Sequence, residues 1–412
     1  MRAAVWTVAN RLGAAAGTPA ELRAALLAGP PPPPGPVRGA LPGYDPDDIA
    51  ELDCLLRDFG HAGLALTRTA VRPGPADLSD PAAVIRADAY AVTAAYEHTA
   101  DGEDHGGLRT AWLRAGQALI REDAPPPLRA LALLAALPAG ADPAVRAALT
   151  TLSSGAPWTV TPADAGAGPV PVAALGVLAG RLLVADRAGT VRGLDARRPV
   201  TVATGARIRA LAVAGNGALL LLDERGRLRV HGPGTALTDA VAATLVAHPG
   251  TALAAAAGSV LVGDRTGSVH AFGPAGLHQA ALHAGRVTAL AATGAAAPVV
   301  VSGGADGTVR RWRPGRTDSG APLTRRSFPV AALHAAEADA GSGPQSGTAY
   351  AVAWADGLAE LHRPGAVPLG FRPGPAVRAV AVTPDGSLVV GTDETLVRLR
   401  PNRTDRTVCA GS

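Results

Sequence analysis

The feature that most constrains this chain is a tight turn that recurs six times in its C-terminal part. Each copy joins two short apolar runs through glycine or acidic residues. In the 412-residue sequence the turns fall at positions 189, 226, 267, 307, 357 and 394, with spacings of 37, 41, 40, 50 and 37 residues. Glycine reaches positive φ angles at low cost, and aspartate bonds its own turn backbone, so both suit hairpins. This part of the chain therefore repeats one supersecondary unit.

Repeats of about forty residues with four short strands each predict a β-propeller. Six repeats give six blades, whereas a seventh would need a degenerate blade within residues 237–257 or 323–350. The last repeat has no obvious fourth strand, but Trp158-Thr-Val-Thr161, just before the first repeat, could supply it. Such a closure would leave no free sheet edge. The stretched fifth repeat is predicted to contain a flexible surface insertion at residues 338–347.

The fourth repeat is the most specific one. It begins at His283, carries Ser302 at the end of an apolar strand, turns at Asp306 and ends at Trp312. Residues 283–312 resemble a WD-repeat, and residues 377–399 resemble another.

In the WD-repeat family a strand serine or threonine, a histidine, a turn aspartate and a tryptophan form a buried hydrogen-bonded network within the blade. The resemblance implies that Ser302, His283, Asp306 and Trp312 form this network, and that its role is structural. It extends over about residues 157–402, but only two blades match specifically. A related propeller outside the WD family remains the alternative.

The N-terminal part is predicted to be helical. Helix starts with a capping side chain and an early proline occur at Thr18-Pro19, Asp45-Pro46 and Asp80-Pro81. Apolar runs with helical spacing bring the total to about six helices, with short loops typical of an antiparallel bundle. The last three runs are residues 108–120, 128–137 and 145–152.

The predicted fold class is therefore an N-terminal helical bundle followed by a C-terminal β-propeller. We assign residues 1–155 to the α-helical domain, with a proline-rich linker at residues 30–36. Residues 156–403 form the WD40-like β-propeller, and residues 404–412 are predicted to be a disordered tail.

Composition and charge say little about a partner. The sequence has no lysine, so all 38 basic residues are arginines, and alanine, glycine and proline are abundant. This bias is typical of a GC-rich genome such as that of an actinobacterium. Residues 1–156 carry 13 arginines and 17 acidic residues, whereas residues 157–412 carry 25 and 17. The two parts could attract each other or an anionic partner, or could simply be solvated.

Several classes of function lack their sequence signal. Neither a Gly-x-Ser-x-Gly elbow nor a His-Glu-x-x-His motif occurs, and the absence of lysine excludes lysine-dependent phosphate or Schiff-base chemistry. The two cysteines, Cys54 and Cys409, make neither a disulfide framework nor a zinc site and suit a reducing compartment. No apolar run approaches eighteen residues. We expect a cytoplasmic protein with no membrane association and no cofactor.

One N-terminal cluster could in principle hold a divalent metal. Two histidines, His98 and His105, lie among the carboxylates of Glu97, Asp101, Glu103 and Asp104. Their spacing matches no ligand pattern, so a solvated acidic loop between two helices is the favoured interpretation, and no metal site is predicted.

We therefore expect a non-catalytic protein–protein interaction scaffold or regulatory adaptor that binds a protein or peptide through the propeller faces. The alternative is a propeller-based enzyme or small-ligand sensor with acids and histidines at the central channel. A nucleic-acid partner is disfavoured because the arginines lack interleaved aromatic residues.

Overall fold

The computed structural model describes residues 1–29, 35–42, 45–70, 73–75, 77–100, 102–161, 171–194, 201–316, 320–337 and 347–402. Within it, Met1–Val160, Ala355–Leu358 and Arg372–Ala376 form one compact unit, and the rest of the chain forms a second. The predicted tail and nearly all of the predicted linker and insertion lie outside the described residues.

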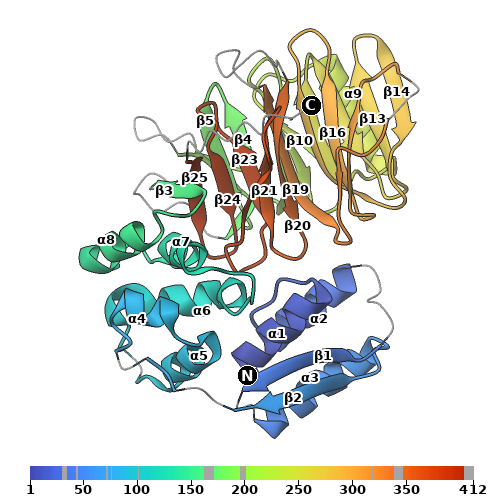
Figure 1. Ribbon diagram of the computed structural model, residues 1–412. Coiled ribbons are helices and arrows are strands. Elements are labelled where there is room, and N and C mark those ends of the chain that lie inside the picture. Colours follow the sequence, from blue (N-terminus) through green and yellow to red (C-terminus); the bar gives the residue numbers. More distant parts are fainter. Residues whose placement is uncertain are drawn as a thin grey trace, which may run out of the picture. The chain divides into compact units, whose positions relative to one another are not determined.

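Helices dominate the N-terminal region, as predicted. Prolines at the first turn and capping side chains explain three of the starts: Thr18 Oγ1 accepts from Glu21 N at 3.2 Å, Asp45 Oδ1 from Asp47 N at 3.0 Å and Asp80 Oδ1 from Ala82 N at 2.9 Å. The helices are α1 Arg2–Leu12, α2 Pro19–Ala28, α3 Pro46–Asp58, α4 Pro81–Arg86, α5 Ala89–His98, α6 Leu108–Leu119, α7 Pro126–Ala136 and α8 Pro143–Leu152 (Figure 1).

Three features of this region were not predicted. Helix α1 was missed, and the helix expected after Ser79 is two helices, because the Asp88 carboxylate accepts from the N–H groups of Tyr90 and Ala91 and starts α5 anew. Strands β1 Val37–Pro42 and β2 Leu64–Thr69 pair in parallel, with α3 as the crossover between them. Strand β1 buries only Val37 and Leu41, and β2 is mostly exposed, so their apolar pattern is weak.

Two apolar cores hold the helical region together. One gathers α4 to α8 around Trp112 and Tyr96 and also takes in Trp6, and the other gathers α1, α2, α3 and β1. Gly116 shows how closely the first core is packed, since a Cβ atom there would lie 2.0 Å from the Trp6 ring. Only glycine fits this position of α6.

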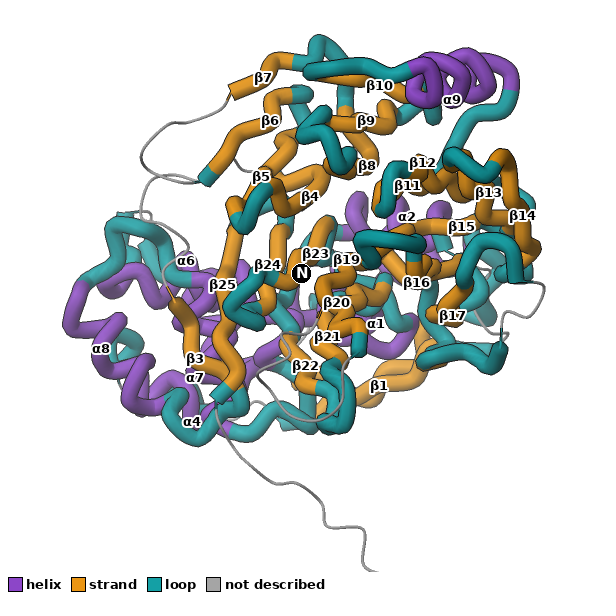
Figure 2. Tube along the Cα trace, turned by 90° about the horizontal axis from the view of Figure 1, so that it is seen from above, coloured by secondary structure: helices purple, strands orange, loops and turns teal. Residues whose placement is uncertain are grey.

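The propeller has six blades in the described part of the chain, which confirms the predicted fold class. Five blades have four strands and the second has three. The first strand of each blade contacts the first strand of the next, and β23 contacts β4, so the ring is closed (Figure 2). Blade 1 contains β4 Val172–Leu178, β5 Arg181–Asp186, β6 Thr190–Gly193 and β7 Thr201–Ala203, and blade 2 contains β8 Ile208–Val213, β9 Leu219–Asp223 and β10 Leu228–His231. Blade 3 contains β11 Ala252–Ala256, β12 Ser259–Gly263, β13 Ser268–Gly273 and β14 Gly276–Ala281, and blade 4 contains β15 Val287–Thr293, β16 Val299–Gly304, β17 Thr308–Trp312 and β18 Thr324–Arg325. Blade 5 contains β19 Val330–Glu337, β20 Thr348–Trp354, β21 Ala359–His362 and β22 Leu369–Phe371, and blade 6 contains β23 Ala379–Val382, β24 Leu388–Gly391, β25 Leu396–Pro401 and β3 Trp158–Thr161.

The sixth blade is closed as the sequence suggested. Strand β3 is its fourth strand and lies beside β25. Thr161 Oγ1 donates to the carbonyl oxygen of Arg398 at 3.3 Å, which ties residues 237 positions apart. The blade therefore combines the beginning and the end of the propeller sequence.

In the described residues of the two ranges offered for a seventh blade, no such blade is found. Residues 323–350 belong to blades 4 and 5, and residues 237–257 contain helix α9 Ala236–Ala247 followed by β11. Helix α9 begins at a capping box in which Thr235 and Thr238 bond each other's backbone N–H. It buries Val241 and Leu245 against apolar residues of blades 2 and 3, and it follows the three-stranded blade directly.

No helix in the described ranges combines the length and apolar character that a membrane crossing requires.

We predict that Trp158 in β3 is needed for a stable ring. Its side chain is 1% exposed, so Trp158→Ala should lower the free energy of unfolding by about 3–5 kcal/mol. Urea unfolding of the full chain measures this. The control is Thr159→Val, which keeps a β-branched side chain at the exposed neighbouring position. Equal stability of the two variants would contradict the assigned role of β3.

Candidate functional site

Three of the four predicted residues of blade 4 meet at the imidazole of His283, which lies in the link between β14 and β15. Its Nε2 lies 2.9 Å from Ser302 Oγ on β16, and its Nδ1 lies 3.1 Å from Asp306 Oδ1 in the following turn. Thr308 Oγ1 lies 3.0 Å from the same Nδ1 and donates to Asp306 Oδ1 at 2.8 Å. Asp306 Oδ2 also accepts from Ala284 N at 3.0 Å.

The charges in this network follow from burial and hydrogen bonding. Burial lowers the pKa of His283 and outweighs the attraction of Asp306, so the imidazole is neutral at neutral pH. For Asp306, burial acts to raise the pKa, but the hydrogen bonds from Ala284 and Thr308 together hold it below its ordinary value. The network is therefore a charged carboxylate held by neutral donors.

Ser302 contacts His283, which contacts Asp306, as serine, histidine and aspartate do in a hydrolase triad. Nucleophilic chemistry is disfavoured, however, because Ser302 is closed to solvent. Ser302 is 0% exposed, and its hydroxyl also lies 3.5 Å from the Arg310 carbonyl oxygen, within donating distance. A nucleophile needs an open site beside it where the reacting atom can be placed. These contacts connect a link, a strand and a turn of one blade, so the geometry supports a structural role.

Trp312 lies apart from this network. It is buried, but its indole N–H donates to the Arg316 carbonyl oxygen at 3.0 Å. Thr308 takes part instead and was not among the predicted residues. The signal was a hydroxyl residue two positions after the turn aspartate.

Turn aspartates hold the other blades in a simpler way. Asp186 accepts from the backbone N–H of Thr190 at 2.8 Å, and Asp223 and Asp264 each accept from two N–H groups of their own turns. The turn also needs glycine, because backbone from another segment lies too close to leave room for a side chain. At Gly307, where φ is +69°, a Cβ atom would lie 2.1 Å from the Arg326 carbonyl oxygen.

The histidines of the acidic N-terminal loop do not converge. His98 Nδ1 lies 2.6 Å from the Ala94 carbonyl oxygen, whereas His105 packs against the Tyr96 ring. Asp104 accepts from the backbone N–H of Thr110 at 2.8 Å, and Asp101 lies outside the described residues. Within the described ranges no group of three or more histidine, cysteine or carboxylate residues is arranged to hold a metal ion.

One histidine lies on the innermost strand of blade 5. His334, on β19, accepts the backbone N–H of Val382 of β23 at Nδ1, over 3.2 Å. An acceptor nitrogen carries no proton, so the proton of the neutral ring is on Nε2. Burial lowers the pKa of His334 to about 4. This imidazole links the first strands of blades 5 and 6.

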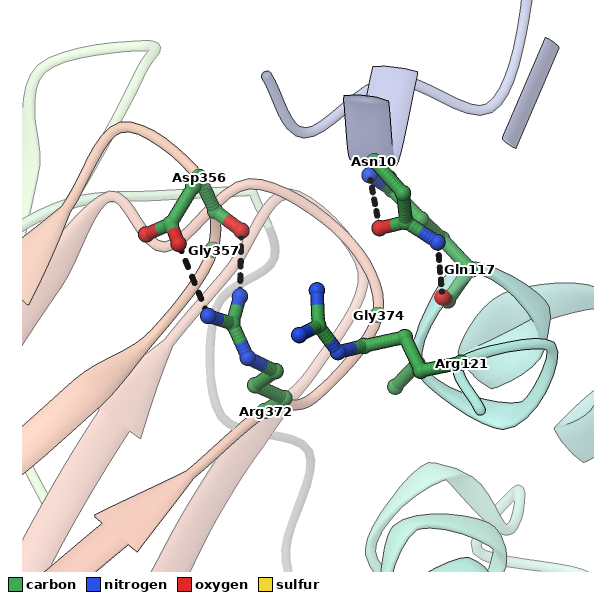
Figure 3. A pocket seen from close by; sticks show the side chains of 8 residues that line it. Asn10, Gln117, Arg121, Asp356, Gly357, Arg372 and Gly374 are labelled. Atoms are coloured by element: carbon green, nitrogen blue, oxygen red, sulfur yellow. Dashed lines mark hydrogen bonds and ion pairs between the residues drawn. The ribbon is translucent and has the colours of Figure 1, made fainter. Parts of the chain in front are cut away.

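A small pocket lies within the first compact unit (Figure 3). Its polar groups already have partners: Gln117 bonds Asn10 in both directions, and Arg372 bonds the carboxylate and carbonyl oxygens of Asp356 at 2.7 Å each. Arg121 is paired with Asp123 at 2.8 Å. The pocket volume is about 10 Å³, which is room for one water molecule. It is too small for a substrate.

Unpaired charge gathers instead at one end of blades 2 to 4, which are neighbours in the ring (Figure 2). Arg209 lies at the start of β8, Arg265 in the turn after β12 and Arg286 just before β15, and all three are exposed. We call these three residues the arginine cluster. Partial burial is the largest cause that lowers the pKa of Arg286, and repulsion by Arg209 and Arg265 adds to it. None of them has an ion pair with a carboxylate of the described residues.

No family model matches the chain, and no curated protein matches it. Among solved structures, the chain is similar to the computationally designed Ika8 protein, with 18% identity, a TM-score of 0.34 and coverage of 56% of this chain and 71% of that one. It is also similar to a streptogramin B lyase, with 10% identity, a TM-score of 0.40 and coverage of 60% and 98%. At these values neither structure informs the function of this chain. The molecule is a six-bladed β-propeller preceded by a helical region.

We predict that Asp306→Ala lowers the free energy of unfolding by about 1–3 kcal/mol, because it removes a half-buried acceptor of several hydrogen bonds. Chemical denaturation of the full chain measures this. Glu224→Ala, at an exposed turn acid of blade 2, is the control and should change little. A stable Asp306→Ala chain would show that the network does not support the blade.

His334 should make the propeller sensitive to acid. Its pKa in the folded protein, about 4, lies below the ordinary value of 6.5, so the unfolded chain binds the proton more readily. The free energy of unfolding that depends on neutral His334 is fully present above pH 6.5. It falls by up to about 3 kcal/mol as the pH drops toward 4.

His334→Asn keeps an acceptor for Val382 N–H and removes the titration, so stability should depend less steeply on pH between 6.5 and 4. Denaturant unfolding at a series of pH values measures the slope. His248→Asn, at an exposed imidazole, is the control and should keep the wild-type slope. An unchanged slope in His334→Asn would refute the assignment.

Proposed function

We propose that this protein is a non-catalytic scaffold or adaptor. It holds a protein or peptide partner against the end of the propeller that carries the arginine cluster. The arginine cluster carries the proposal. It places three exposed guanidinium groups from three adjacent blades at one end of the ring. Arginine is enriched in protein interfaces because its planar group makes several hydrogen bonds and also packs against apolar surfaces.

The polar groups that resemble an active site support binding rather than turnover. Ser302 and His283 are buried and Asp306 is half-buried, and the pocket of Figure 3 holds about one water molecule. An enzyme or small-ligand sensor would place carboxylates or histidines together at the channel. In the described chain His334 is bonded to a neighbouring strand, and no observation favours that alternative.

We also propose that blade 4 is a WD-type repeat. The contacts of His283 with Ser302 and Asp306 support this assignment, and the bond from Trp312 to Arg316 departs from the family's network. A cytoplasmic location is part of the same proposal, since the exposed Cys54 thiol is free and suits a reducing compartment.

The proposal is tested by mapping a partner. Tagged full-length protein is used to isolate partners from its native cell, and the complex is then rebuilt from purified components. Hydrogen exchange of the full chain with and without the partner should show protection in the propeller turns near residues 207–209, 224–226, 264–267 and 284–287. Protection confined to residues 2–152 would contradict the proposal, and so would turnover of the bound molecule.

A further inference from the structure

Backbone hydrogen bonds fix the arginine cluster at one end of its blades. Val287 N donates to the Asp264 carbonyl oxygen at 2.9 Å, so the turn that carries Arg265 lies against the start of β15, next to Arg286. In blade 2, Glu224 N donates to the Arg207 carbonyl oxygen at 3.1 Å, and Arg209 Nη2 donates to the Glu224 carbonyl oxygen at 3.3 Å. The positions of the arginines therefore follow from the sheet register.

Two carboxylates near the cluster, those of Asp264 and Asp306, are engaged elsewhere. Asp264 bonds Thr266, Ser268 and His270, the last at 2.9 Å. Asp306 is held within the buried network of blade 4. Glu224 meets Arg209 through its backbone carbonyl oxygen. The three guanidinium groups thus remain without an acidic partner in the described residues.

Blades 1 and 6 provide an internal comparison. Arg378 precedes Ala379-Val-Ala-Val382 as Arg209 precedes Ala210-Leu-Ala-Val213. Arg378, however, donates twice to Asp393 Oδ2, at 2.9 and 2.6 Å, and Arg187 lies 3.0 Å from Asp393 Oδ1. The turn of blade 6 supplies an acid to the arginines beside it, whereas the turn of blade 3 adds Arg265. Among the described residues, blades 2 to 4 therefore carry unpaired arginines at this end of the propeller. In blades 6 and 1 the arginines at the same end, Arg378 and Arg187, are paired with Asp393.

We propose that the arginine cluster binds an acidic segment of the partner, whose aspartate or glutamate side chains pair with Arg209, Arg265 and Arg286. This inference rests on the function proposed above. Arginine pairs with carboxylates through two parallel hydrogen bonds, so an extended acidic peptide crossing from blade 2 to blade 4 can satisfy the three groups in turn. Exposed large apolar residues of the described chain are leucines and valines, so a stacking surface for nucleic-acid bases is lacking there.

The probe is a fluorescein-labelled decapeptide of alternating glutamate and glycine, titrated with the full chain and followed by fluorescence anisotropy. We expect Arg209→Gln, Arg265→Gln and Arg286→Gln each to weaken binding about 3-fold to 10-fold at 50 mM salt, and the triple variant at least about 30-fold. Binding by the wild-type chain should weaken as salt rises. Because these side chains are exposed, the variants should keep the wild-type thermal stability.

Two controls separate a specific site from overall charge. The triple variant Arg311→Gln, Arg313→Gln and Arg363→Gln removes the same charge from exposed positions away from the cluster and should bind within about 2-fold of wild type. Arg378→Gln, at the position matching Arg209, should also bind normally because its charge is already paired.

Several results would overturn the inference. These are equal loss of binding in the two triple variants, tight binding of a glutamine–glycine decapeptide, and preference for single-stranded DNA or inorganic phosphate over the acidic peptide. Absence of binding by the wild-type chain would do the same. A partner mapped to the propeller turns would still leave the proposed function standing in each case.

Discussion

The propeller depends on one requirement: every blade but the last can take its strands from a continuous stretch of chain, whereas the last must be completed from the other end. Strand β3 fulfils this requirement, since it lies beside β25 as the fourth strand of blade 6. A strand edge left open in a ring would expose unpaired N–H and carbonyl groups and invite pairing with another molecule. The packing of first strands around the ring includes the contact of β23 with β4, so blade 6 must be present for the ring to close.

Much of this architecture could be predicted from sequence because its signals are local. Turn glycines and aspartates recur at a fixed spacing, and helix starts such as Asp45-Pro46 carry both a cap and a proline. The predictions failed where tertiary context decides. Strands β1 and β2 are too short and exposed to show a clear pattern, and Asp88 splits a helix that looked continuous. Helix α9 occupies the place of the expected fourth strand, and the sequence carries its start signal in the capping box of Thr235 and Thr238.

The candidate site shows the same division. The meeting of His283, Ser302 and Asp306 could be anticipated from their resemblance to a family pattern, but the bond of Trp312 to Arg316 depends on the local path of the backbone. The arginine cluster could not be predicted, because its members lie in three different repeats and share one end of the molecule only when blades 2, 3 and 4 pack side by side. Arg209 and Arg378 occupy matching positions, but within the described chain only Arg378 has an ion pair, which it forms with Asp393. Such an ion pair exists only in the folded molecule.

The closing strand also imposes an order of events during synthesis. Thr161 leaves the ribosome long before Arg398, to which it bonds 237 residues later. At about 5–20 residues per second, β3 waits roughly 12–47 seconds for its partner strand. During that time the helices that precede it can fold while β3 still has an exposed edge. The strand that protects the finished ring is thus the one left unprotected longest while the ring is being made.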